Sequence, residues 1–286
     1  MSGVDFDLPT GYAYRHLKEA ITEDPSLEKY LDESVRRILT LKFMLGLFEN
    51  PFSDPEKCEQ FVGNPSNVAV AGEIAGESIV LLKNRNNTLP LDYRKINSIA
   101  VIGPNATSKE TGAYSVRNDH VVSILEGIKK SVPERIKVNF AKGCEIARFE
   151  NWETGPTNMI IATLHEEENS LNQAVNLAGA SDVAIVVVGG TTQTSHEAWL
   201  RDGFKGDRST LGLLGNQEEL ISRIAATGKP VIVILMGGKP YAVTQVAEKA
   251  DALLSTFYLG QQTGVAVCNV LSGKVNPSGK LAIGFP

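Results

Sequence analysis

Several short runs of the chain are apolar at every position rather than at alternate positions. A strand with one face in water alternates apolar and polar residues, so a continuous apolar run is typical of a strand buried on both faces of a parallel sheet. Such runs occupy residues 99–102, 183–188, 231–235 and 252–254, and residues 136–140 form a less continuous one. The pattern predicts a largely parallel sheet.

Between these runs the apolar residues recur at helical spacing. A helix over 68–82 is expected before the first run, and two more are expected between the later ones. Their apolar positions are Leu171, Ala174, Val175 and Ala178 in one, and Leu220, Ile221, Ile224 and Ala225 in the other. Strands that alternate with helices predict an α/β sandwich, in which right-handed crossovers place helices on both faces of the sheet.

The first part of the chain has a different pattern. Residues 31–45 carry apolar side chains on one helical face, and Gly46 is placed to end the helix. Pro51 and Pro55 then interrupt regular structure. We therefore divide the chain into residues 1–50, a linker at 51–65, and an α/β domain at 66–286. The apolar face of the first helix is expected to be covered by the α/β domain or by a second copy of the chain.

Composition narrows the class of protein. The 286 residues include 28 Lys and Arg against 33 Asp and Glu, a net charge of -5, with no long basic run, so a nucleic-acid partner is not expected. No apolar stretch approaches the roughly 20 residues that span a bilayer, and no membrane partner is expected. The three cysteines are scattered, without the spacing of a disulfide framework or a zinc site.

Candidate chemistry is sought in the loops that follow the predicted strands, because ligands of such sheets bind beyond the carboxyl ends of the strands. The loop from Gly189 to Arg208 is long for a compact α/β unit and contains Glu197 and Trp199. Aromatic faces stack on sugar rings and carboxylates perform acid–base work, so this composition suits a carbohydrate site. The alternative is a solvated loop whose charges pair with one another.

Other motifs do not support a cofactor. Residues 273–280 resemble a phosphate-binding loop, but the spacing of the glycines is one residue too long, and Leu281 stands where Ser or Thr would hold magnesium. We interpret this segment as a turn before a final strand at 281–286. The glycines after the strands do not continue into a dinucleotide fingerprint, and His196-Glu197 lacks the second histidine of a zinc motif. No metal and no cofactor are expected.

Several segments together resemble glycoside hydrolase family 3, in its bacterial β-glucosidase and β-xylosidase branch. Three early segments are similar to the close of that family's barrel domain, and four later ones to its α/β sandwich domain. The early segments are 3–9, 31–39 and 45–51; the later ones are 77–84, 100–105, 206–217 and 276–281. The resemblance implies that residues 1–50 are the C-terminal remnant of a barrel domain. Residues 258–263 depart from the family pattern, which has a Pro before the Gly and an acidic residue after the Gln.

The resemblance also implies roles for residues. Ser195-His196-Glu197-Ala198 is similar to the segment that carries the catalytic acid/base, so Glu197 is the candidate for that role, with Asp202 or Asp207 as the alternative. Asp207 and Arg208 are expected to pair and order the loop. The candidate substrate-binding residues are Tyr114, Ser115 and Trp199.

In this family an Asp of the barrel attacks the anomeric carbon, and the resemblance places that nucleophile before Met1, so neither Asp5 nor Asp7 is expected to be it. The whole enzyme is then expected to hydrolyse terminal β-linked glucose or xylose with retention, and this chain alone to be inactive.

Expected partners are the β-glycoside or oligosaccharide substrate, the missing barrel domain and a second copy of the chain. The family suggests a periplasmic or secreted bacterial protein. The competing hypotheses are a stand-alone sugar-binding or regulatory module and a nucleotide-binding α/β protein, the latter lacking a phosphate loop.

Overall fold

The computed structural model describes residues 3–8, 10–112, 115, 118–149, 159–195 and 210–286. The chain forms two compact units, Met1–Asn64 and Pro65–Pro286, which are described separately below. None of the described helices is both long enough and apolar enough to cross a membrane.

The second unit is built on a six-stranded sheet of order β1-β8-β7-β6-β2-β3. All pairs are parallel except β1 with β8, which is antiparallel. The strands are β1 Val80–Asn84, β2 Ser98–Ile102, β3 Lys137–Ala141, β6 Val183–Gly189, β7 Val231–Met236 and β8 Ala252–Ser255; β4 Arg148–Phe149 and β5 Met159–Ile160 form a separate two-stranded pair. The predicted parallel α/β sandwich is confirmed.

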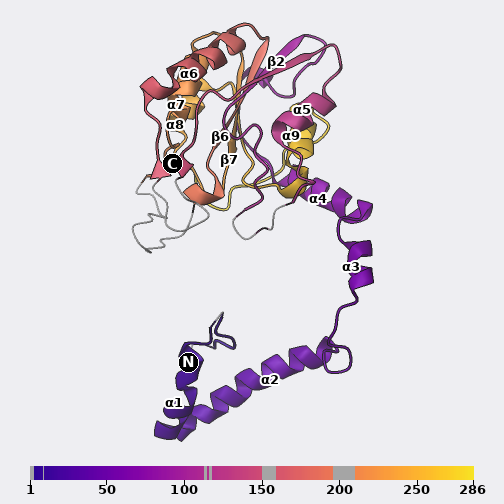
Figure 1. The fold of residues 1–286 in the computed structure, drawn as a ribbon. Coiled ribbons are helices and arrows are strands. Elements are labelled where there is room, and N and C mark those ends of the chain that lie inside the picture. The colour runs from indigo at the N-terminus through magenta and orange to yellow at the C-terminus, as the bar shows by residue number, and fades with distance from the viewer. Residues whose placement is uncertain (1–2, 9, 113–114, 116–117, 150–158, 196–209) are drawn as a thin grey trace. The chain divides into compact units, whose positions relative to one another are not determined.

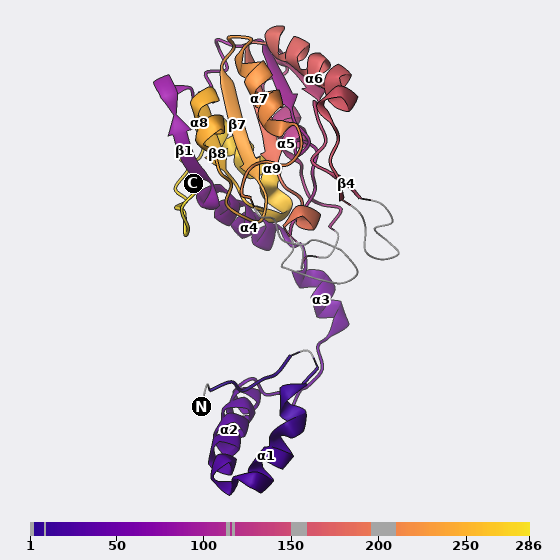
Figure 2. The same ribbon diagram turned by 90° about the vertical axis from the view of Figure 1, so that its left-hand side faces the viewer.

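Helices cover both faces of this sheet (Figures 1 and 2), with α5 and α9 on one side of the strands and α6, α7 and α8 on the other. Their bounds are α4 Pro65–Ser78, α5 Ile124–Ser131, α6 Leu164–Gly179, α7 Gln217–Ala225, α8 Thr244–Lys249 and α9 Thr263–Leu271. Alternate residues of one strand enter opposite cores: Ile185 and Val187 join the α5/α9 side, whereas Val186 and Val188 join the α6/α7 side. This arrangement explains the continuous apolar runs, since neither face of the central strands meets water.

Two expectations for this unit are wrong. The helix expected over 68–82 ends at Ser78, and residues 80–84 instead form the edge strand β1, with Val80 opposite Ser255. Consecutive β-branched residues, Ile79 and Val80, favour a strand, and pairing with β8 stabilises it. The final strand expected at 281–286 does not form, and Phe285 packs against the α6/α7 core instead.

The first unit contains α1 Leu17–Glu23, α2 Glu28–Met44 and α3 Pro55–Phe61. Helix α3 lies inside the segment expected to be a linker, and Asp54 caps it by accepting a hydrogen bond from the Glu56 amide at 3.0 Å. None of the described residues in this unit is fully buried. On α2, Val35 is 42% exposed and Leu39 40% exposed, so within its own unit the apolar face of the helix is only partly covered.

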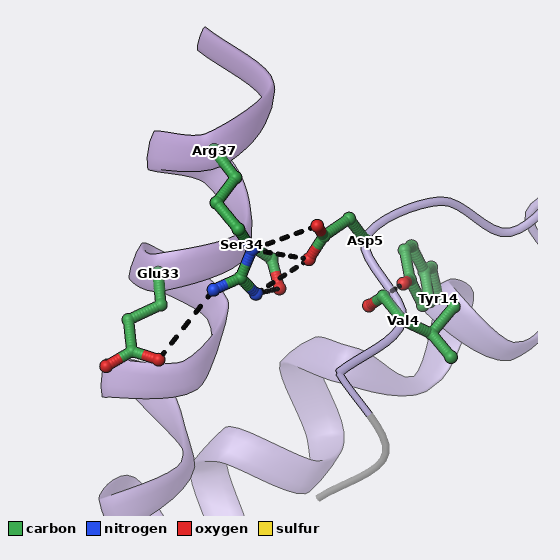
Figure 3. A network of polar contacts seen from close by, with 6 residues as sticks. All are labelled: Val4, Asp5, Tyr14, Glu33, Ser34 and Arg37. Atoms are coloured by element: carbon green, nitrogen blue, oxygen red, sulfur yellow. Dashed lines mark hydrogen bonds and ion pairs between the residues drawn. The ribbon is translucent and has the colours of Figure 1, made fainter. Parts of the chain in front are cut away.

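Polar contacts tie residues 3–7 to α2 (Figure 3). Arg37 donates to both oxygens of Asp5, with Nη2 2.7 Å from Oδ1 and Nε 2.9 Å from Oδ2. The same guanidinium contacts Ser34 Oγ at 3.1 Å, and its hydrogen bonds to Asp5 lower the pKa of that carboxyl. Next to this pair, Tyr14 Oη donates to the Val4 carbonyl at 2.6 Å. Asp5 therefore has a positioning contact inside this unit.

A carboxylate at the opposite end of the sheet from the candidate loops gives a test of the fold. Asp182 precedes β6 and accepts hydrogen bonds from the Asn97 amide at 2.7 Å and from the Ser98 amide at 2.9 Å, and these bonds lower its pKa. Because the pKa of Asp182 is lower in the folded than in the unfolded state, its ionised form stabilises the fold at pH values above the unfolded pKa of about 3.9. This stabilisation is lost as the pH falls through the pKa of the folded state.

We expect Asp182→Asn to lower the urea midpoint of unfolding near neutral pH, with the difference from wild type shrinking as the pH falls below about 4. The matched control is Glu134→Gln, because Glu134 is an exposed carboxylate of the same unit. A difference between Asp182→Asn and wild type that is unchanged across this pH range would show that the charge of Asp182 does not contribute.

Candidate functional site at the carboxyl edge of the sheet

The loops after β2, β6, β7 and β8 all begin at one edge of the sheet, because these four strands are mutually parallel. Loops at the carboxyl ends of parallel strands are the usual ligand-binding positions of such folds. The long loop that contains the predicted acid/base residue is one of them, since it starts at the end of β6.

Two glycines allow these loops to leave the sheet with their backbones in close contact. Gly103 has φ +115°, and a Cβ there would lie 2.1 Å from the Val187 carbonyl oxygen. Gly189 has φ +140°, and a Cβ there would lie 1.8 Å from the Met236 carbonyl oxygen. No other residue type fits either position without moving a strand end.

Two buried side-chain amides hold the end of β6. Gln217 accepts from the Gly189 amide at 2.8 Å and donates to the Gly189 carbonyl at 2.9 Å, while its second N–H reaches the Leu214 carbonyl at 2.8 Å. Asn105 donates to the Gly190 carbonyl at 2.9 Å. The start of the long loop is therefore held by hydrogen bonds from the first residue of α7 and from the loop after β2.

The described part of the long loop is compact. The Thr191 amide donates to Thr194 Oγ1 at 2.9 Å around the short 3-10 helix η4, Thr192–Thr194. Ser195 lies beside the loop after β7, since a Cβ added to Gly238 of that loop would be 3.8 Å from the Cβ of Ser195. On the other side of residues 196–209, the Leu211 carbonyl accepts from the Ala242 amide at 2.9 Å. The loop thus leaves from and returns to the same edge of the sheet.

This edge also carries unsatisfied polar atoms. Across the described ranges, the buried side-chain oxygens and nitrogens without a hydrogen-bond partner are Asn105 Oδ1, Thr191 Oγ1 and Ser195 Oγ, and all three lie here. Buried polar groups are nearly always paired in folded proteins, so a cluster of exceptions marks a place that further groups are expected to contact.

A partly buried carboxylate, Glu110, joins three of the loops. Its Oε2 accepts from the Thr192 amide at 2.5 Å and lies 3.4 Å from Tyr258 Oη. Burial raises the pKa of Glu110, and the hydrogen bonds from Thr192 and Tyr258 oppose that rise. Burial together with the nearby charge of Glu110 raises the pKa of Tyr258, so its hydroxyl stays protonated and can donate.

A polar pocket of about 400 Å³ lies next to Glu110. Its described lining is Lys109, Glu110, Thr111, Gly112, Ser115, Asn118, Asp119 and Thr192. Ser115, a predicted substrate-binding residue, is exposed here and donates through Oγ to the Thr111 carbonyl at 2.9 Å. The other predicted site residues lie outside the described residues: Tyr114, Glu197, Trp199, Asp207 and Arg208, with the alternative acid Asp202.

Comparison with known proteins gives the same assignment as the sequence motifs. Residues 79–286 match the family model described as "Glycosyl hydrolase family 3 C-terminal domain". A β-xylosidase of Formosa agariphila is 40% identical over all of this chain, which covers 38% of that relative. A periplasmic β-glucosidase of Salmonella typhimurium is 34% identical, again over all of this chain and 38% of the relative. The structure of a β-glucosidase from Erythrobacter marinus superposes with a TM-score of 0.81 at 33% identity, covering 92% of this chain and 36% of the other.

The chain belongs to glycosyl hydrolase family 3. The resemblance seen in the motifs is thereby confirmed, and with it membership of a family of β-glycoside hydrolases. The chain spans well under half the length of these relatives, and residues 79–286 of it match the family's C-terminal domain.

The sequence did not single out Glu110 or Gln217 as residues that build this edge of the family 3 domain. Glu110 lies between the segment 100–105, which resembles the family, and the candidate substrate-binding residues Tyr114 and Ser115, and it is the one acidic residue from 103 to 118. An acidic side chain in a short loop after a buried strand is a signal that could have identified it. Gln217 ends the segment 206–217 that resembles the family, but its contact with Gly189 joins residues 28 positions apart, which the motif does not show.

The glycine at the end of β6 can be tested in this family 3 domain. Gly189→Ala should reduce the free energy of unfolding by about 3 kcal/mol or more, because the new Cβ meets the Met236 carbonyl and the positive φ adds strain. Gly228→Ala is the matched control: its φ is +72°, but nothing lies within 4 Å of the added Cβ, so a loss of only about 1 kcal/mol is expected. Urea denaturation measures both, and equal losses would show that the close approach at Gly189 costs nothing.

Proposed function

We propose that this chain supplies the general acid/base, Glu197, to a retaining β-glycosidase whose nucleophile is an Asp of a barrel domain. The substrates proposed are terminal β-linked glucose and xylose residues, as the names of the relatives suggest. The observation that supports the proposal is that Ser195 and Leu211, which lie on either side of the segment 196–209 in the sequence, both contact the loop after β7 at the carboxyl edge of the sheet, where chemistry occurs in this fold class.

Retention requires two carboxyl groups about 5–5.5 Å apart, one of which attacks the anomeric carbon while the other protonates the leaving oxygen. The same acid, now ionised, then takes a proton from the water that releases the sugar. A glutamic acid can donate at working pH when burial or a neighbouring carboxylate raises its pKa. In the proposed enzyme, the carboxylate of the barrel would be that neighbour of Glu197.

The first unit supports a two-domain enzyme. Its described residues build no buried core, and a groove of about 730 Å³ opens among residues 3–7, α1 and α2. A helix is stabilised mostly by packing of its apolar face, which these residues leave partly exposed. We propose that further parts of a barrel cover this face in the whole enzyme, and that Asp207 and Arg208 order the acid/base loop there. The periplasmic relative suggests a periplasmic or secreted location.

The isolated chain should not hydrolyse glycosides. A general acid contributes only about 10²–10⁴-fold and cannot replace the covalent step. We therefore expect no detectable nitrophenol from nitrophenyl β-glucoside or β-xyloside with the 286-residue chain. Turnover that disappears in the Glu197→Gln variant of the same chain would contradict the requirement for a second domain.

The role of Glu197 is tested in the full-length enzyme by the leaving-group dependence of the loss. Glu197→Gln should reduce kcat/KM for disaccharides by about 10²-fold or more, because a sugar alkoxide departs only when protonated. The loss for nitrophenyl glycosides should be much smaller, since a phenolate of low pKa needs little protonation.

The matched control is Asp202→Asn, which removes a competing carboxylate of the same loop and should show no leaving-group-dependent loss. Asp207→Asn removes the other competing carboxylate; because Asp207 is proposed to order the loop, it should show a leaving-group-dependent loss smaller than that of Glu197→Gln. Equal losses on both substrates for Glu197→Gln, with a selective loss in one of the aspartate variants, would move the acid role to that aspartate.

A further inference from the structure

Glu110 occupies a position that the proposed chemistry does not explain. It lies in the loop after β2, 82 residues before Thr192 in the sequence, yet its Oε2 accepts the Thr192 amide hydrogen at 2.5 Å. Thr192 begins the short helix η4, and Ser195, three residues later, is the last described residue before the segment 196–209. The carboxylate therefore contacts the chain at the point where the long loop begins.

Tyr258 closes the same contact from a third loop. Its hydroxyl lies 3.4 Å from Glu110 Oε2, and its ring lies against two backbones: an added Cβ on Gly238 would be 3.2 Å from its Cε2, and one on Gly112 would be 3.8 Å from its Cδ2. Gly238 and Gly112 thus bring the backbones of the loops after β7 and β2 against the tyrosine ring. The loops after β2, β6, β7 and β8 thus meet around one tyrosine and one carboxylate.

Among the residues that the structure describes, none forms an ion pair with Glu110. Its neighbour Lys109 extends toward Glu126, with Nζ 3.4 Å from Oε1. The contacts of Glu110 are an amide and a phenol, and burial raises its pKa. Placing a carboxylate where its charged form is disfavoured has a cost in stability, and such groups concentrate at functional sites.

We propose that Glu110 is a positioning residue for the acid/base loop: by accepting from the Thr192 amide and Tyr258 Oη, it fixes the start of the segment that carries Glu197. The proposal rests on the acid role of Glu197. A carboxylate accepts both donors with one oxygen, whereas Ala leaves the Thr192 amide and the Tyr258 hydroxyl without this acceptor. The acid would then lose alignment with the leaving oxygen, and misplacement of about 1 Å can cost about 10²-fold in rate.

Hydrogen exchange of the 286-residue chain tests the anchor without any chemistry. In Glu110→Ala, the Thr192 amide should exchange about tenfold faster or more, because it loses its acceptor, whereas amides of β6 and β7 keep their protection. Glu110→Gln retains an acceptor oxygen and should restore most of the protection. Glu134→Ala, at an exposed glutamate of the same unit, is the control and should change nothing at Thr192. Unchanged exchange at Thr192 in Glu110→Ala would overturn the anchor.

Kinetics of the full-length enzyme test the positioning. Glu110→Ala should lower kcat/KM for disaccharides by about 10²-fold, with a smaller loss for nitrophenyl glycosides and recovery in Glu110→Gln. In a Glu197→Gln background, Glu110→Ala should cause no further leaving-group-dependent loss, because no acid remains to be positioned. Faster exchange at Thr192 without a selective loss on disaccharides would overturn the positioning role. If Glu197→Gln alone lowers kcat/KM equally for disaccharides and nitrophenyl glycosides, Glu197 is not the acid, and the proposed function fails. The exchange experiment does not depend on that role, so the two failures can be told apart.

Discussion

The peptide of Gly189 is the point on which the carboxyl edge depends. Strand β6 pairs with β2 only as far as Val186, so the last residue of β6 has no partner strand on that side. Gln217 supplies the missing partner, accepting from the Gly189 amide and donating to its carbonyl as a neighbouring strand would. Because Gln217 is fully buried, loss of this pair would leave a buried amide and carbonyl unsatisfied, at about 1–3 kcal/mol each.

From this fixed peptide the loops acquire their geometry. Asn105 holds the next carbonyl, that of Gly190, and the Thr191–Thr194 turn follows directly. The glycines at 103 and 189 are required because the loops pass within contact of neighbouring carbonyls rather than of side chains. If the loop carries the acid/base as proposed, such a start helps to place its carboxyl group, since catalytic groups are held by the rigidity of the elements that carry them.

The sequence predicted the parts of the fold that depend on burial alone. Strands β2, β6, β7 and β8 appear as continuous apolar runs because both of their faces are covered, and periodicity detects that directly. Strand β1 was missed because it is an edge strand, with only Val80 buried, and it follows a helix without a break. Its identity is decided by pairing with β8, far along the chain, which local pattern does not contain.

At the site, too, the features visible in the local sequence were predicted, and those that depend on contacts between distant residues were not. The long loop and its position after β6 follow from loop length and strand order, both visible in the sequence. Glu110 does not, because its burial and its hydrogen bonds come from residues 82 and 148 positions away. An isolated acidic residue in a loop is ordinarily a solvated charge. Only the convergence of three loops on one oxygen gives it a different role.

The two units differ in what holds each of them together. The second unit has two continuous apolar cores, one on each face of its sheet. The first has an exposed apolar helix face and the Asp5–Arg37 pair, whose side chains are 27% and 48% exposed. Exposed ion pairs contribute little to stability, so they cannot replace a core. The described residues of this unit therefore leave the apolar face of α2 only partly covered, and in the proposed enzyme further parts of a barrel would cover it.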